Sequence, residues 1–345
     1  MLYRAKAPLR IGLAGGGTDV SPYADMHGGA ILNATVSLFA TATIEPLAGE
    51  TITLDSRDLG ECITLSVAHR LPVDGKLDLL KGVYNRVVQD FGLQPQGFRL
   101  TTEVDAPKGS GMGTSSTVTV AVLGAFAQWL NLPLGEYDVA RLAYDIERVD
   151  LGMSGGRQDQ YAATFGGFNY MEFYADEKVI VNPLRVRRSY QKELEHNLLL
   201  YYTGTSRLSA AIIDQQVEAF AKTRHDQAES DSITAAHALK QQAVRMKEAL
   251  LTGDLDAIGP LLDFGWQHKK KLAAGISNPL IDQLYTTALR AGASGGKISG
   301  AGGGGFMTFY CPGSTRHAVA DALADFGGEI RPFTFVDEGM VGWST

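Results

Sequence analysis

The sequence has few of the residues from which disulfide frameworks and zinc sites are built. It contains two cysteines in 345 residues, Cys62 and Cys311, which lie far apart and in no CxxC pair. We expect both thiols to be buried as small apolar side chains in a reducing compartment. The seven histidines form no HxxxH or HxxEH pair, so we expect no zinc site.

Positive charge and long apolar runs are also scarce. The formal net charge is −7, so the phosphate backbone of a nucleic acid would be repelled, and we interpret the short basic run "RVRR" at 185–188 as a solvated loop. No apolar stretch approaches the ~20 residues that span a bilayer, and Arg10 interrupts the N-terminal segment before it reaches signal-peptide length. We therefore predict a cytoplasmic protein with neither a nucleic acid nor a membrane as partner.

What the sequence does contain is an ordinary globular composition, with 45% apolar and 20% charged residues. Strand patterns dominate its first third, and β-branched, partly alternating residues predict strands at 30–46, 51–56, 62–67 and 98–104. Between them, residues 78–92 have apolar side chains at helical spacing and end in a glycine, which predicts a helix.

Helices, a loop and a strand are expected next. Residues 114–131 are apolar on most faces, which favours a helix buried in the middle of a domain. Residues 135–150 have one apolar helical face, residues 151–167 are expected to form a loop, and 168–173 a strand.

A polar, charged stretch at 175–196, with a strand at 178–184, marks the expected boundary between domains 1–185 and 186–345. Helical patterns dominate the second domain. Its predicted elements are a strand at 197–204, helices at about 207–223, 231–252, 254–273 and 278–291, a strand at 304–311, a helix near 315–326 and a strand at 329–336. Strands and helices do not alternate strictly, so the sequence predicts an α+β fold.

The stretch "APKGSGMGTSST" at 106–117 has the features of a phosphate-binding loop. Glycines permit a tight path and close approach of a ligand, and the following helix start offers unpaired N–H groups and a favourable dipole for an anion. The stretch is not a Walker A loop, which needs GxxxxGK[ST], and it lacks the βαβ context of a dinucleotide-binding turn. A structural turn is the alternative for this loop taken alone.

Two further glycine clusters strengthen the case. "GLAGGGTD" occupies 12–19, and "GGKISGAGGGGF" occupies 295–306 between a predicted helix and a predicted strand. Runs of glycine are costly in chain entropy and contribute no packing, so close approach to a ligand or to another loop is the simplest explanation. A permissive surface loop is the alternative.

The three motifs "APLRIGLAGGGTD", "PKGSGMGTSS" and "GGKISGAGGGGF", in this order and spacing, closely resemble those of the GHMP kinases. The stretches "GRQDQYAATFGGFNYMEF" and "YYTGTSR" look most like the D-glycero-D-manno-heptose 7-phosphate kinases of that family. The resemblance implies two α+β domains, the first like the second domain of ribosomal protein S5 and the second ferredoxin-like, with the active site in the groove between them. It also implies transfer of a phosphoryl group from ATP to the anomeric hydroxyl of a sugar phosphate.

The resemblance implies that the second motif binds the ATP phosphates, with the helix start, backbone amides and Mg²⁺ in place of a P-loop lysine. The residues concerned are Pro107, Gly109, Ser110, Gly111, Met112, Gly113, Thr114, Ser115 and Ser116. Lys108 could add charge at the rim or be solvated. The implied Mg²⁺ ligands are Ser115, with Thr114 as the alternative, and Glu147. From the residues alone, Glu147 could equally be a surface acid paired with Arg148 or Arg141.

Asp159 matches the family's carboxylate that faces the acceptor hydroxyl, and Arg10 matches the cation beside it. The implied sugar-binding residues are Gly16, Gly17, Thr18, Asp19, Arg157, Arg207, Gly302 and Gly303. Asp19 could instead cap a helix or an Asx-turn. Arg157 and Arg207 are the candidates for anchoring a phosphate already on the sugar, unless either pairs with a carboxylate.

Other functions fit parts of the sequence. An L-fucose or other neutral-sugar 1-kinase is the main alternative among enzymes. A silent sugar sensor of the same fold is disfavoured because Arg10, Ser115, Glu147 and Asp159 are all present. A nicotinamide-dependent dehydrogenase is disfavoured by the spacing of the glycines.

Overall fold

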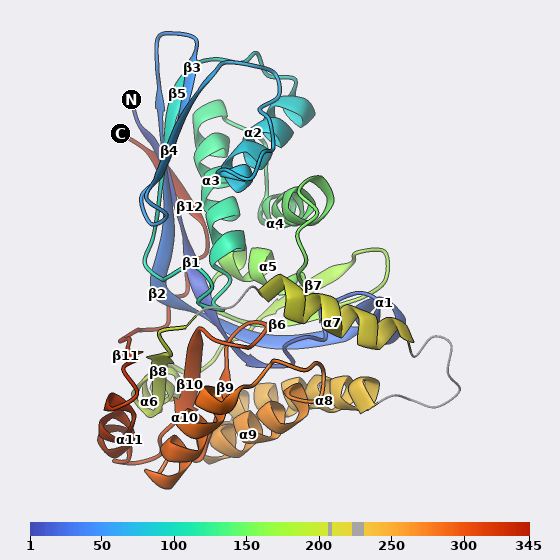
Figure 1. The fold of residues 1–345 in the computed structure, drawn as a ribbon, viewed down its shortest axis with the longest axis vertical. Coiled ribbons are helices and arrows are strands. Elements are labelled where there is room, and N and C mark those ends of the chain that lie inside the picture. Colours follow the sequence, from blue (N-terminus) through green and yellow to red (C-terminus); the bar gives the residue numbers. More distant parts are fainter. Residues whose placement is uncertain (206–208, 223–230) are drawn as a thin grey trace.

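Two antiparallel-rich sheets with helices packed on them make up the protein, which confirms the predicted α+β class. The computed structural model describes residues 1–205, 209–222 and 231–345. The two ends of the chain lie together at the first sheet (Figure 1), because β1 (Tyr3–Ala14) pairs with β12 (Val341–Ser344). The division at residue 185 stays a prediction, since β12 joins the first sheet from the far end of the chain.

The first sheet is organised around one long strand. β2 (Gly29–Pro46) pairs with β1 on one side, and on the other with β6 (Phe168–Phe173) along its first half and β5 (Phe98–Val104) along its last. The outer members are β3 (Thr51–Ser56), β4 (Glu61–Ser66) and β7 (Val179–Pro183). Only the β3–β5 pair is parallel within the described chain.

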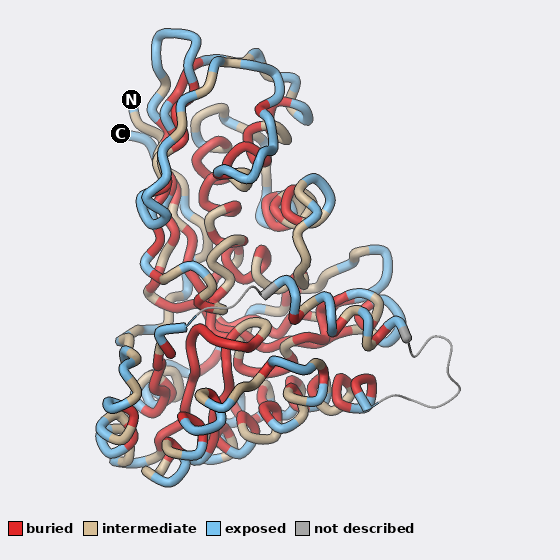
Figure 2. The backbone as a smooth tube through the Cα atoms, in the orientation of Figure 1, coloured by how far each residue is buried: buried red, intermediate tan, exposed pale blue. Residues whose placement is uncertain are grey.

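Helix α3 (Thr114–Leu130) is buried behind this sheet, as its apolar composition predicts. It packs on β1 and β2, with α2 (Asp78–Phe91), α4 (Glu136–Asp145) and α5 (Gln158–Phe165) around it (Figures 1 and 2). Its sequence has apolar or small residues on every face, so no face needs water. The first turn of α3 is only partly buried, and there it meets the residues of the site.

The second sheet is smaller and lies among the helices of the second half. It runs in the order β11 (Glu329–Ile330), β8 (Leu198–Tyr202), β10 (Phe306–Tyr310), β9 (Gly295–Ile298), all antiparallel. The helices around it are α6 (Arg188–Asn197), α7 (Ser209–Lys222), α8 (Asp231–Thr252), α9 (Ile258–Lys269), α10 (Pro279–Arg290) and α11 (Arg316–Ala324). Buried Trp266 and Phe309 belong to its core.

Several expectations about elements were wrong. The predicted loop 151–167 contains α5. The predicted helix 135–150 is present, as α4 followed by a π-helix at Ile146–Asp150. The predicted strand 329–336 is only the two-residue β11, because Pro332 cannot donate to a ladder. The predicted helix 254–273 begins as a 3₁₀ turn at Leu255–Ala257 and ends at Lys269. Helices α1 (Tyr23–His27) and α6 and strands β1, β9 and β12 carried no sequence prediction.

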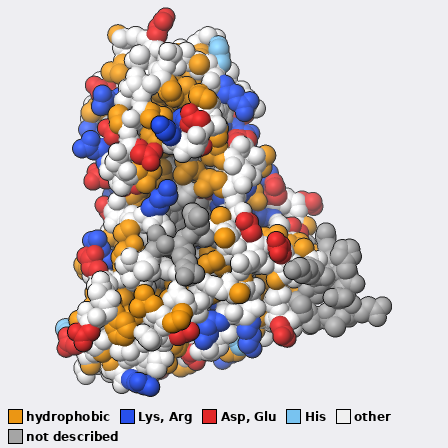
Figure 3. Space-filling view, viewed as in Figure 1, with side chains coloured by type: hydrophobic (Ala, Val, Ile, Leu, Met, Phe, Trp, Pro, Cys, Tyr) orange, Lys and Arg blue, Asp and Glu red, His pale blue; other side chains and the backbone are white. Residues whose placement is uncertain are grey.

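The surface corrects one prediction and bears on two others. Cys62 is exposed on the edge strand β4, whereas Cys311 is buried as predicted. Within the described residues, no helix combines the length and apolar character that a bilayer crossing needs. On the face in Figure 3, basic and acidic side chains are interspersed. All three arginines of the "RVRR" run, Arg185, Arg187 and Arg188, are exposed.

Candidate active site

One cleft, of about 560 Å³, brings together residues from both halves of the chain. It is lined by residues within 10–20, 108–116, 147–159 and 210–216, together with Lys269, Gly300 and Ala301. The hydroxyl of Ser154 donates to Asp214 of α7 at 2.5 Å, which joins two of these segments. The walls of the cleft therefore contain residues of the first two glycine motifs and the middle of the third.

The phosphate loop turns into α3 through three glycines. Gly109, Gly111 and Gly113 all have φ between 74° and 79°, a region that side chains rarely adopt. Gly113 is the N-cap, and no side chain caps this helix end. The first turn of α3 lines the cleft, so its backbone N–H groups and dipole favour an anion there.

The second and third glycine motifs pack backbone against backbone. A Cβ on Gly111 would lie 2.6 Å from the carbonyl oxygen of Ser299, and one on Gly300 would lie 2.7 Å from the Cα of Gly111. A Cβ on Gly305 would lie 2.5 Å from the carbonyl oxygen of Ser110, which also accepts a hydrogen bond from Phe306. The predicted close approach of these glycines is confirmed, and the other loop is what they approach.

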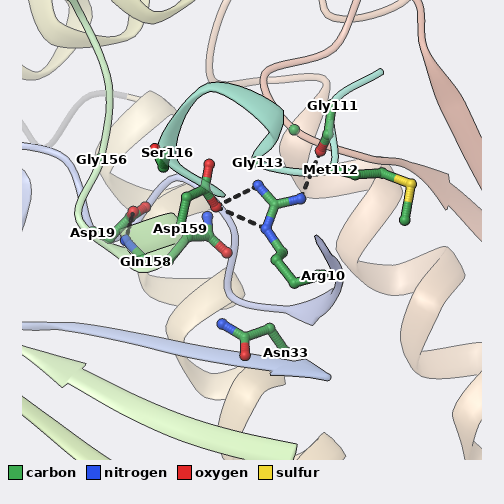
Figure 4. A network of polar contacts seen from close by, with 12 residues as sticks. Arg10, Asp19, Asn33, Gly111, Met112, Gly113, Ser116, Gly156, Gln158 and Asp159 are labelled. Atoms are coloured by element: carbon green, nitrogen blue, oxygen red, sulfur yellow. Dashed lines mark hydrogen bonds and ion pairs between the residues drawn. The ribbon is translucent and has the colours of Figure 1, made fainter. Parts of the chain in front are cut away.

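Arg10 connects the first motif to both the second motif and Asp159 (Figure 4). Its Nε and Nη2 donate to one oxygen of Asp159, Oδ1, at 2.7 and 2.6 Å, and its Nη1 donates to the carbonyl oxygen of Gly111 at 2.6 Å. The side chains of Arg10 and Asp159 are 4% and 24% exposed. Neither contact uses Oδ2, and no other described residue binds this oxygen, so a ligand in the cleft can do so.

Asp19 supports the helix that carries Asp159. Its Oδ2 accepts hydrogen bonds from the backbone N–H groups of Arg157 and Gln158 at 2.9 and 3.1 Å, which are at the start of α5. Asp19 is not the N-cap residue of α5, which is Arg157, but its carboxylate accepts from the N–H groups of that helix start, and it also lines the cleft. Burial raises the pKa of its carboxyl, the charge of Asp159 raises it further, and the backbone hydrogen bonds oppose both.

Glu147 lies in the π-helix, at the floor of the phosphate loop. Ser115 donates to its Oε1 at 2.8 Å and Ser116 to its Oε2 at 2.7 Å, and Gln160 also donates to Oε2. The residue is fully buried, so it is not a surface acid, although the expected pairing with Arg148 is present, with Nη2 3.7 Å from Oε2. The local π turn shifts the helix register, a device that recurs at functional sites.

The residues around Glu147 fit Mg²⁺. A carboxylate and a serine hydroxyl are hard oxygen donors in direct contact, and Mg²⁺ in kinases takes few protein ligands beside phosphates and water. Among the described residues no cluster of three or more His, Cys, Asp or Glu side chains offers a metal site made of protein alone. The hydroxyl of Thr114 instead bonds Ser110 at 2.8 Å, which favours Ser115 as the hydroxyl ligand.

Some predicted substrate residues do not line the cleft. Arg157 directs its guanidinium to Asp25 at 2.7 Å and to the carbonyl oxygen of Tyr174 at 2.8 Å, with its side chain 4% exposed. Its guanidinium therefore pairs with a carboxylate, as the alternative expects, and the role as phosphate anchor stays a prediction that this pairing disfavours. Arg207 lies outside the described residues.

The remaining predicted residues have structural partners. The hydroxyl of Thr18 donates to the carbonyl oxygens of Gly15 and Ala30 and accepts from the N–H of Ala30, which fixes a turn. Gly302 and Gly303 contact the backbone of Ile276. The members of the predicted set that are absent from the cleft wall are Pro107, Met112, Gly16, Thr18, Arg157, Gly302 and Gly303. Gly17, Asp19 and the other described members line it.

Sequence reasoning missed two buried lysines. Lys269 lines the cleft and donates to the carbonyl oxygen of Gly300 at 2.6 Å, while Lys297 donates to that of Gly12 at 2.7 Å. Burial lowers the pKa of Lys269 to about 8, and burial with the charges of Lys269 and Arg10 lowers the pKa of Lys297 well below its usual range. The run of three lysines at 269–271 suggests a surface patch. Only the position of Lys269 at the end of an amphipathic helix could have indicated that it is buried.

Similarity to known kinases extends over the whole chain. The family model described as GHMP kinases N terminal domain matches residues 78–167, and that described as GHMP kinases C terminal matches residues 246–329. The chain is 45% identical over 340 residues to the D-glycero-alpha-D-manno-heptose 7-phosphate kinase of Campylobacter jejuni. The aligned region covers 99% of this chain and 98% of that protein.

Solved structures extend the same likeness to three dimensions. A D-glycero-D-manno-heptose 1-phosphate kinase from Bacteroides thetaiotaomicron superimposes with a TM-score of 0.84 at 45% identity, covering 99% of each chain. The galactokinase of Lactococcus lactis, solved with galactose, gives a TM-score of 0.78 at 21% identity over 99% of this chain and 95% of that chain, a likeness of fold.

Proposed function

The chain belongs to the GHMP kinase family, and from this premise we propose that it transfers the γ-phosphoryl group of ATP to the anomeric hydroxyl of D-glycero-D-manno-heptose 7-phosphate. It is a phosphotransferase with an alcohol group as acceptor, it acts on a sugar phosphate, and it has the two-domain GHMP kinase fold. The resemblance carried by the three glycine motifs is thereby confirmed. ATP is the phosphate donor of this family.

The observation that carries the proposal is the contact of Arg10 with both Asp159 and Gly111. One guanidinium joins the carboxylate that would face the acceptor to the loop that would hold the donor's phosphates. Phosphoryl transfer requires these two groups to be aligned within a fraction of an ångström, and a buried, fully engaged side chain supplies that alignment.

The proposed reaction follows from this arrangement. The acceptor oxygen attacks the γ-phosphorus, its bond to phosphorus forms as the bond to the β–γ bridging oxygen breaks, and ADP leaves. The proton of the acceptor hydroxyl passes to Oδ2 of Asp159, the oxygen that Arg10 does not bind. The N–H groups at the start of α3 hold the phosphates of ATP and of the transition state.

We propose that Ser115 and Glu147 hold Mg²⁺ with the ATP phosphates. When bound, the ion would spread the charge that develops on the phosphate oxygens. Ser116 and Gln160 position the Glu147 carboxylate by hydrogen bonds to it.

At the sugar end, Gly17 and Asp19 lie in the cleft wall beside Asp159. The phosphate already on the sugar needs a cation, and Arg207 is the one proposed for it now that Arg157 is paired with Asp25. We propose that the reaction takes place in the cytoplasm, where ATP is supplied.

The experiment is ADP release by the purified protein with ATP, Mg²⁺ and a panel of D-glycero-D-manno-heptose 7-phosphate, L-fucose and galactose. The proposal expects the heptose phosphate to have the highest kcat/KM. A preference for fucose would favour the neutral-sugar kinase, to which fucokinase relatives at 26 to 27% identity point. Binding of sugar without turnover of any panel member would favour a sensor.

A further inference from the structure

Lys269 is a buried cation in the cleft wall that the reaction scheme above does not use. It is the last residue of α9, and although it lines the cleft, only 5% of its surface is exposed. The two lysines that follow are different. Lys270 lies over the ring of Trp266, with Nζ 5.4 Å from the ring centre, and Lys271 is exposed.

The ammonium group of Lys269 is incompletely paired. The carbonyl oxygen of Gly300 is its only hydrogen-bond acceptor among the described residues, at 2.6 Å, although an ammonium has three hydrogens to donate. A buried cation with unused donors is costly unless another polar group completes its shell. In a cleft wall, that group can come from a ligand.

The surroundings of the ammonium lie on the acceptor side of the cleft. A Cβ on Gly16 would lie 3.4 Å from Nζ, so the missing side chain of Gly16 leaves room beside the ammonium. After burial, which lowers the pKa of Lys269, the charges acting on it are those of Asp19, Arg10 and Asp159. The residues proposed to hold Mg²⁺, Ser115 and Glu147, have no hydrogen bond or ion pair with it.

We propose that Lys269 binds the acceptor sugar: its Nζ donates hydrogen bonds to sugar oxygens adjacent to the one that receives the phosphoryl group. This inference rests on the proposed function and adds a residue to its acceptor site. The cation also faces the phosphate once it has been transferred, where it favours the charge of the product. Lys297 serves as a contrast, because it is buried against Gly12 and does not line the cleft.

The charge of Lys269 sets a pH limit on this interaction. The groups that face it are Arg10 from β1, Asp19 from the loop after β1, Asp159 from α5 and Lys297 from β9. With a pKa of about 8, the ammonium loses its proton in weakly alkaline solution. Affinity for the sugar phosphate should therefore fall above pH 8, whereas an arginine at this position stays charged.

The test compares Lys269→Met, Lys269→Arg and the matched control Lys271→Met, an exposed lysine two residues along. Isothermal titration calorimetry measures binding of D-glycero-D-manno-heptose 7-phosphate and, separately, of ADP, from pH 7 to pH 9. We expect Lys269→Met to weaken sugar-phosphate binding at least about tenfold and ADP binding less than about twofold. Lys271→Met should match the wild type, and Lys269→Arg should lose the decline above pH 8.

Two results in Lys269→Met would overturn the inference. Unchanged sugar-phosphate binding in Lys269→Met removes the contact, and equal loss of sugar-phosphate and ADP binding assigns Lys269 to holding the Gly300 loop. If Lys269→Met does not fold, the test is the pH dependence of sugar-phosphate binding in the wild type compared with that in Lys269→Arg, because both keep a cation. The same decline above pH 8 in both would then overturn the inference. Failure of the proposed function is seen separately, as a wild-type protein that neither binds nor turns over the heptose phosphate.

Discussion

The most informative perturbation is a double-mutant cycle on Arg10 and Asp159. The cycle compares the wild type with the single variants Arg10→Met and Asp159→Asn and with the variant that carries both substitutions. Both nitrogens that Arg10 offers to Asp159 bind the same oxygen, so the cation and the carboxylate should act as one unit. Removing either should then remove most of what the pair contributes to the reaction.

The expected losses of kcat follow from the proposed roles of Arg10 and Asp159. Loss of a positioned general base costs roughly 10²- to 10⁴-fold in kcat, and loss of a preorganised cation roughly 10²- to 10³-fold. Independent effects would multiply to roughly 10⁴- to 10⁷-fold in the double variant. We expect the double variant instead to lie within about threefold of the slower single variant, which corresponds to a coupling of about 3 kcal/mol.

Stability adds a second readout. In Arg10→Met the Gly111 carbonyl and a carboxylate that is 24% exposed lose their partner, which should cost about 2 to 3 kcal/mol of unfolding free energy. The assay is coupled ADP release with kcat and KM for each substrate, alongside chemical denaturation. Fully multiplicative losses in the double variant would refute the reasoning that the pair acts as a unit.

The chain offers a matched control in Arg86 and Asp150. Arg86 also binds an aspartate through Nε and Nη2, at 2.8 and 2.6 Å, but outside the cleft wall, with side chains 18% and 33% exposed. Arg86→Met should leave kcat within about twofold and lower stability by less than about 1 kcal/mol.

Four further variants test separate parts of this account. Glu147→Gln should weaken the apparent affinity for Mg²⁺ at least about tenfold in the ADP-release assay, because it removes a charged oxygen ligand. Gly111→Ala should lower the unfolding free energy by about 2 kcal/mol or more and raise KM for ATP, since φ is +77° and its Cβ would lie 2.6 Å from the carbonyl oxygen of Ser299. Arg207→Met should raise KM for the sugar phosphate about tenfold and spare ATP, whereas Arg157→Met should chiefly lower the melting temperature, because its ion pair is structural.

Each of these variants has its own control or its own contradicting result. Unchanged Mg²⁺ dependence in Glu147→Gln would remove it from the ligand set. Gly60→Ala has a similar φ of +65° with no atom within 4 Å of the added Cβ, so it isolates backbone strain from the clash, and an equal loss in both would discount the loop contact. A KM effect in Arg157→Met larger than that in Arg207→Met would reverse their assignments.

The sequence was most informative where local chemistry decides the structure. The buried helix at 114–130 and the strand at 98–104 follow from composition and periodicity, and the costly glycines at 111, 300 and 305 indicated close approach. Their common function came from resemblance to a family, because spacing alone does not reveal that distant loops meet.

The residues and strands that sequence analysis misjudged have interaction partners far away in the sequence. Arg157 resembled a free cation until the fold brought Asp25 to it. Lys269 belongs to a run of three lysines, and the sequence does not show that it alone is buried while Lys271 is exposed. Strand β12 exists because β1 offers it an edge, and Cys62 is exposed because β4 is itself an edge strand, neither of which a single sequence displays.

The claim that this cleft makes an anomeric sugar phosphate is tested most directly by ³¹P NMR of the product formed from D-glycero-D-manno-heptose 7-phosphate, ATP and Mg²⁺. The account predicts ADP together with a second sugar phosphorus signal coupled to the anomeric proton, formed by the wild type and lost in Asp159→Asn. A new phosphate on any other carbon, or ATP consumption that yields only inorganic phosphate, would contradict it.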